Sequence, residues 1–102
     1  MATEYTRTGA VLTLKPGQDS AEFSINAASK DASGVCNMEG TAQQIAAGEN
    51  QARRWVWKDN ASQCVAVLSE QTNGKLTVKT KGCDGYCGLS AAGAMDGTYS
   101  RK

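Results

Sequence analysis

The chain has 102 residues, a formal net charge of +1 and no histidine. The lack of histidine excludes Ser-His-Asp triads, Cys-His dyads and most zinc sites. The nearly balanced charge argues against a nucleic-acid-binding surface or a polybasic membrane patch, and no stretch is long and apolar enough to predict a transmembrane helix. At this length we expect a single domain over residues 1–102.

Short runs of alternating apolar and polar residues, separated by turn residues, recur along the chain. This pattern is typical of an all-β domain, and about eight short strands joined mostly by hairpins predict a small antiparallel barrel or a two-sheet sandwich. For residues 42–50 a short helix, a single turn and a loop all stay open. The predicted strands cover residues 4–8, 11–15, 21–28, 35–43, 51–58, 63–71, 75–81 and 94–101.

The dipeptide Asn73-Gly74 is the strongest hairpin signal, because both residues tolerate the positive φ of a two-residue type I′ turn. Such a loop sets Val67 opposite Thr80.

A four-residue loop at 59–62 similarly sets Trp57 opposite Cys64. These registers place Val56, Val65, Val67, Leu76 and Val78 on one face of the sheet and Trp55, Trp57, Cys64, Ala66 and Leu68 on the other.

Cys36, Cys64, Cys83 and Cys87 are spaced like disulfide partners in a small exported domain. The favoured pairing joins Cys36 to Cys64 and Cys83 to Cys87. Continuing the hairpin register sets Cys64 opposite Cys83, so Cys64–Cys83 with Cys36–Cys87 is the alternative. A redox site would need a C-x2-C motif at a helix start, and a four-thiolate zinc site would need a second close pair. We therefore expect structural disulfides, no metal and no cofactor.

The first residues lack the basic and apolar regions of an export signal. Because the cysteines indicate an oxidising compartment, we expect a periplasmic or secreted protein whose signal peptide has been removed from this sequence.

The C-terminal run 82–88 (GCDGYCG), an alanine at Ala91 or Ala92, and the run 96–99 (DGTY) form a recognisable pattern. It resembles a signature of small exported bacterial β-domain proteins, in which a cysteine, a YCG triplet, an alanine and a final G-x-Y strand close the domain. Residues 34–42 and 64–67 are similar to the rest of that pattern. Such proteins resemble periplasmic lysozyme inhibitors and immunity proteins against type VI secreted amidases, and the likeness covers roughly residues 20–100.

The chain departs from one branch of this group. Membrane-bound inhibitors of c-type lysozyme carry a serine-glycine loop before a T-K-G motif, whereas here the TKG run at 80–82 precedes the SAAG run at 90–93. The inhibitory residues of that branch are therefore not carried over.

A cleft-plugging inhibitor needs a rigid, protruding loop of small and polar residues, because preorganisation lowers the entropy lost on docking. Residues 84–93 fit this description. We predict Tyr86 or Leu89 as an apolar anchor and Asp84 or Ser90 as a contact to the partner's catalytic groups. The alternative is that this loop only connects the last two strands.

Trp55 and Trp57 share one face and form a second candidate partner-binding site, since tryptophan is enriched in binding hot spots. The alternative is core packing beside a disulfide.

No pair of acidic residues lies in a recognisable acid/base motif, and a domain of this size offers no deep cleft. We therefore predict a non-enzymatic periplasmic protein that inhibits a peptidoglycan-degrading enzyme by loop insertion. Its partner would be a protein, with no nucleic acid involved. The alternative is a β-barrel carrier holding a small apolar ligand in its interior.

Overall fold

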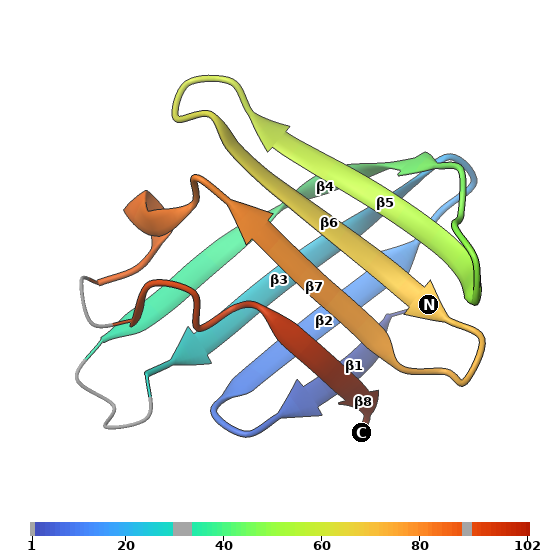
Figure 1. The fold of residues 1–102 in the computed structure, drawn as a ribbon, viewed down its shortest axis with the longest axis horizontal. Helices are drawn as coiled ribbons and strands as arrows, with labels where there is room; N and C mark the ends of the chain where they lie inside the picture. The colour runs from blue at the N-terminus through green and yellow to red at the C-terminus, as the bar shows by residue number, and fades with distance from the viewer. Residues whose placement is uncertain (1, 30–33, 89–90) are drawn as a thin grey trace.

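The computed structural model describes residues 2–29, 34–88 and 91–102. Eight strands form a closed antiparallel barrel, in which each strand pairs with the next and β8 pairs back with β1 (Figure 1). The all-β prediction is confirmed, and of its two architectures the barrel is the one formed. The elements are β1 (Thr3–Arg7), β2 (Ala10–Pro16), β3 (Ser20–Ala28), β4 (Val35–Ile45), β5 (Gln51–Asp59), β6 (Cys64–Gln71), β7 (Leu76–Lys81), the 3-10 helix η1 (Asp84–Tyr86) and β8 (Gly97–Arg101).

The segment 42–50 contains no helix: β4 continues to Ile45, and a turn leads into β5. In this turn the Gln51 N–H donates to the Gly48 carbonyl oxygen, with N and O 3.2 Å apart. The strand continues here because residues 43–45 find partners on β5.

Side chains fill the interior of the barrel. Buried and exposed positions alternate along β2 and β3, because successive side chains of a strand point to opposite faces. Three large aromatic side chains lie at the centre, with Trp55 and Tyr99 fully buried and Tyr5 only 1% exposed. They pack with the inward aliphatic residues of neighbouring strands, including Leu12, Leu14, Ile25, Leu68, Leu76 and Val78.

The β6–β7 hairpin differs from the predicted register by one residue. Val67 pairs with Lys79, one position earlier than expected. The loop has three residues, 72–74, of which only Gly74 has a positive φ, at 90°. The Gly74 N–H donates to the Gln71 carbonyl oxygen (3.0 Å), as in a type I turn followed by a bulged glycine.

A one-residue shift moves every side chain of a strand to the opposite face. Leu76 and Val78 therefore lie in the core with Leu68, and not on the outer face with Val65 and Val67. The prediction that Leu76 and Val78 share a face with Val56, Val65 and Val67 was wrong for this reason.

The β5–β6 loop has four residues, as predicted, but lies one residue further along the chain than the predicted 59–62. Asp59 pairs with Cys64 across a loop of residues 60–63, and Trp57 pairs with Ala66. The register differs by two residues, which leaves each side chain on its predicted face.

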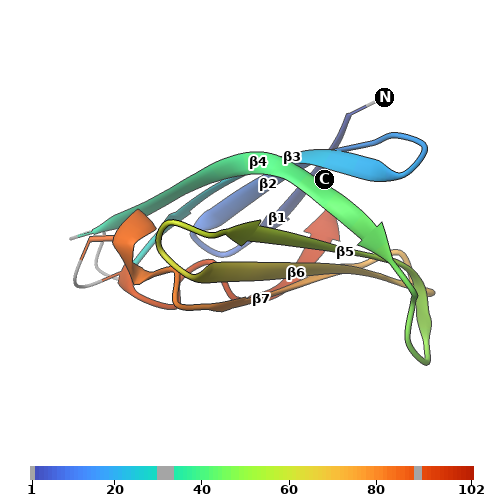
Figure 2. The same ribbon diagram turned by 90° about the horizontal axis from the view of Figure 1, so that it is seen from above.

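β4 and β5 pair only at the C-terminal end of β4. They pair at Gln43 with Val56, Gln44 with Trp55 and Ile45 with Arg54, whereas β4 pairs with β3 along its whole N-terminal part. Figure 2 shows β4 arching away from β5 toward the end of the barrel where η1 lies. We call this diverging region the β4–β5 seam.

Candidate functional site

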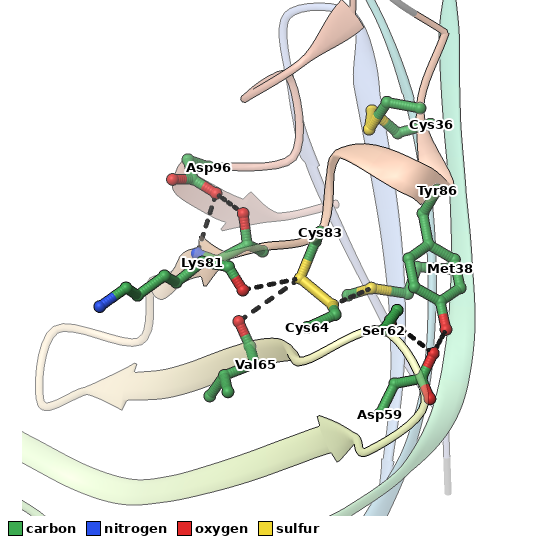
Figure 3. Close-up of a disulfide and its surroundings, with 12 residues drawn as sticks. Cys36, Met38, Asp59, Ser62, Cys64, Val65, Lys81, Cys83, Tyr86 and Asp96 are labelled. Atoms are coloured by element: carbon green, nitrogen blue, oxygen red, sulfur yellow. Dashed lines mark hydrogen bonds between the residues drawn. A yellow bond between two sulfur atoms is a disulfide. The ribbon is translucent and has the colours of Figure 1, made fainter.

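Two disulfides join Cys36 to Cys87 and Cys64 to Cys83. All four cysteines are therefore paired, as expected, but the favoured pairing was wrong and the alternative is confirmed. The physical reason is topological: β4, which carries Cys36, and β6, which begins at Cys64, are separated by β5. Cys83 instead follows β7, the neighbour of β6, and its Cα lies 4.5 Å from that of Cys64 (Figure 3).

The two bridges hold a short segment, residues 83–88, which we call the braced segment. One bridge ties its start to β6 and the other ties its end to β4, the two strands on either side of β5. Next to the second bridge, the Gly88 N–H donates to the Val35 carbonyl oxygen (3.0 Å), and Cys87 forms an isolated antiparallel bridge with Cys36. Within the segment, the Tyr86 N–H donates to the Cys83 carbonyl oxygen (3.0 Å). The backbone of the segment is thus fixed at both ends and internally.

The Tyr86 side chain attaches η1 to the β5–β6 loop. Its hydroxyl donates a hydrogen bond to the carboxylate of Asp59, which also accepts one from the Ser62 hydroxyl at 2.8 Å (Figure 3). The bond from Tyr86 lowers the pKa of Asp59, because donation to a carboxylate favours its charged form. The same bond raises the pKa of Tyr86, because donation to the carboxylate favours the protonated hydroxyl.

Trp57 packs against Tyr86 in the β4–β5 seam. The two rings meet edge to face, with centroids 5.7 Å apart, and Trp57 makes a similar contact with Phe23 at 5.8 Å. Its indole lies directly over Gly40 of β4, where an added Cβ would be 2.4 Å from Nε1. The glycine therefore lets an indole ring occupy the place where β4 and β5 separate.

The sequence-predicted residues divide into three groups. Tyr86 and Trp57 are in contact at the braced end of the barrel, and Asp84, at the start of η1, is exposed. Trp55 is fully buried, so its side chain packs in the core, which is the alternative to partner binding given for it above. Leu89 and Ser90 lie outside the described residues.

Sequence reasoning missed three residues that build this site: Asp59, Ser62 and Gly40. A glycine inside a strand is a recognised sign of close approach by another group, and Gly40 carried that signal. Asp59 and Ser62 were placed in a predicted loop, but nothing local indicated that a tyrosine 27 positions further along would reach them.

A depression of about 430 Å³ adjoins Tyr86 on the outer surface of β3 and β4. Polar side chains line much of it, among them Asn26, Asn37 and Glu39. Within residues 2–29, 34–88 and 91–102, no group of three His, Cys, Asp or Glu side chains is placed to hold a metal ion. The same residues include no helix of the length and apolarity needed to cross a membrane.

No protein-family model, curated protein or solved structure matches the chain.

Proposed function

We propose that this protein is a non-enzymatic periplasmic or secreted binding protein that inhibits a peptidoglycan-degrading enzyme, either a lysozyme or an amidase effector. Inhibition occurs when the braced segment and the residues that follow it enter the active-site cleft of the enzyme. The observation that carries this proposal is the double bracing, in which two disulfides tie one six-residue segment to two different strands.

Bracing matters because a flexible loop loses about 1–2 kcal/mol of backbone entropy for each residue that becomes ordered on binding. The backbone of η1 is already ordered in the free protein, so little of this cost remains. At its tip Asp84 and Gly85 are exposed, and a Cβ added to Gly85 would meet no atom within 4 Å. The Asp84 carboxylate is free to accept hydrogen bonds from donors in the cleft.

In this proposal Tyr86 is not the anchor that enters the cleft. Its hydroxyl is bonded to Asp59 and its ring rests against Trp57, so it orients η1 from behind. Leu89 is then the apolar anchor and Ser90 a polar contact, both carried by the chain that leaves the braced segment.

The compartment is inferred from the cysteines. Two disulfides are compatible with an oxidising environment outside the cytosol, where cell-wall hydrolases act. The resemblance to lysozyme inhibitors and amidase immunity proteins supports the choice of target. The carrier alternative has no comparable support, because large side chains occupy the barrel interior.

The test adds the purified protein to assays in which lysozymes and peptidoglycan amidases digest peptidoglycan. We expect at least one enzyme to be inhibited, and Asp84→Ala and Leu89→Ala each to weaken inhibition about tenfold or more. Glu49→Ala is the matched control, since Glu49 is exposed in the β4–β5 turn, outside the braced segment. Failure to inhibit any enzyme of the panel would contradict the function. Full inhibition by both loop variants would contradict the insertion mechanism alone.

A further inference from the structure

The outer face of β5, β6 and β7 carries positive charge around an apolar centre. Across the strands, Val65 lies between Lys58 and Lys81, and Val67 lies between Val56 and Lys79. The three lysines are exposed and the three valines are partly exposed. We call this surface, which also includes Arg54 in the next row, the basic face.

The cations of the basic face have no acidic partners. In the part of the chain that the structure describes, neither Arg54 nor any of the three lysines forms an ion pair, whereas Arg53 pairs with Glu70 and Lys102 with Glu4. The Nε atom of Arg54 is buried and lacks a hydrogen-bond acceptor. No outward position of the three strands holds Asp or Glu, since their outer residues beside the valines and cations are Ala52, Ser69, Gln71 and Thr77.

One carboxylate borders the basic face: Asp96 accepts hydrogen bonds from the N–H and hydroxyl of Thr80, at 3.0 and 2.6 Å. Other acidic side chains lie on the opposite side of the barrel. The outer surface of β2, β3 and β4 presents Glu22 and Glu39 against a single cation, Lys15, among Thr, Ser and Asn side chains. A net charge of +1 therefore hides a separation of charge between two faces. Such a separation produces a directional field that orients a charged partner before contact.

We infer that the basic face docks a protein partner whose complementary surface is acidic around an apolar centre. An apolar centre with a charged rim is the usual anatomy of a protein–protein interface. Unpaired rim cations would speed association with an acidic surface and slow association with a basic one. A lipid surface fits less well, because the apolar residues here are short valines, without the aromatic or long side chains that enter a bilayer.

This inference goes beyond the proposed function and does not depend on it. The row from Lys58 to Lys81 ends two residues before Cys83, so the basic face borders the braced segment. An enzyme that accepted the segment would meet this face as well. The face exists, however, whether or not the segment enters a cleft.

The test uses the isotope-labelled full chain and three probes followed by NMR. The first probe is a synthetic peptide with two leucines flanked by glutamates, the second replaces the glutamates with lysines, and the third is a vesicle of anionic phospholipid. We expect the glutamate peptide alone to shift the amide signals of Val56, Val65, Val67 and Lys79, with an affinity that falls as salt is added.

The decisive variant is Lys58→Glu with Lys79→Glu and Lys81→Glu. We expect it to bind the glutamate peptide about tenfold more weakly or worse. The matched control, Lys15→Glu with Lys75→Glu and Lys102→Glu, changes the net charge equally and should stay within about twofold of the parent. Equal losses in both variants, or shifts located on another face, would overturn the inference. Vesicle binding through this face without peptide binding would overturn it in favour of a membrane surface.

Discussion

Gly40 is the residue on which the packing of the seam depends. The Trp57 indole lies over it and is held between the rings of Phe23 and Tyr86, so it has little room to move. We predict that Gly40→Ala destabilises the protein by about 1–3 kcal/mol, because the added methyl group overlaps the indole ring. Urea unfolding followed by tryptophan fluorescence measures this change.

Gly85→Ala is the control for this prediction. Gly85 is exposed, and an added Cβ there meets no atom within 4 Å. Its stability should lie within about 0.5 kcal/mol of the parent. If Gly40→Ala is equally harmless, the indole does not rest on β4.

Glu70 is one of two buried polar residues in the described chain, with 8% of its surface exposed. Its carboxylate accepts two bonds from Arg53, at 2.7 and 3.2 Å, and Arg101 lies 4.0 Å away. The bonds from Arg53 are the main reason why the pKa of Glu70 lies below its usual value, and burial opposes them.

A lowered pKa in the folded state means that the unfolded chain binds a proton more readily. The stability due to Glu70 is therefore present above its unfolded pKa and is lost as the pH falls through the folded value. We predict that Glu70→Gln costs about 1–2 kcal/mol at neutral pH, and that parent and variant converge in acid. Urea midpoints at pH 7 and pH 3 provide the measurement. A difference that is independent of pH would show that charge is not its cause.

At the scale of elements, the β6–β7 turn decides which residues of β7 face the core. Gly74 has a φ of 90°, which an L side chain adopts only with strain. We predict that Gly74→Ala destabilises the protein by about 1 kcal/mol while the barrel stays intact. Denaturant midpoints measure the loss of stability, and the far-UV circular dichroism spectrum shows whether the barrel is intact. We expect Asn73→Ala to lower the stability less than Gly74→Ala does, because Asn73 has no positive φ.

The strands were predictable where a strand buries a single face, because this imposes a two-residue repeat on the sequence. The run from Phe23 to Ala27 shows this repeat, and β3 forms with these residues inside. The register was less predictable. Asn-Gly fits both a two-residue and a three-residue loop, and the flanking residues Gln71 and Lys75 do not distinguish them locally.

The candidate site was predictable only in part, because its contacts join distant parts of the chain. The sequence pattern placed Asp84 and Tyr86 in a loop bounded by cysteines, which is where they lie. The bonding of Tyr86 to Asp59 and the packing of Trp57 on Gly40 depend on where β4 leaves β5. No local pattern of residues sets that point. The favoured disulfide pairing was wrong for a related reason, since rejecting Cys36–Cys64 requires knowing that β5 lies between β4 and β6. The hairpin register did indicate the pairing that forms, Cys64 with Cys83.

For the whole molecule, the two disulfides connect different parts of the barrel, with different consequences. Cys64–Cys83 joins neighbouring strand ends of the β6–β7 hairpin and closes a sequence separation of 19. Cys36–Cys87 crosses a separation of 51 and holds the end of the braced segment on β4. By loop-closure entropy these bridges stabilise the fold by about 3 and about 4 kcal/mol, respectively.

Barrel closure itself does not involve either bridge, because β8 completes the ladder with β1 through Tyr5 and Thr6. We therefore predict that Cys36→Ser with Cys87→Ser keeps the far-UV spectrum of the barrel but lowers stability by about 4 kcal/mol. At a temperature where this variant stays folded, it should also inhibit a target hydrolase less strongly than the parent does. The reason is that the end of the braced segment is then free. Cys64→Ser with Cys83→Ser is the comparison, and thermal melts together with inhibition assays on both variants measure the two effects. Undiminished inhibition by the folded Cys36→Ser, Cys87→Ser variant would mean that the tie to β4 stabilises the barrel without preparing the segment for binding.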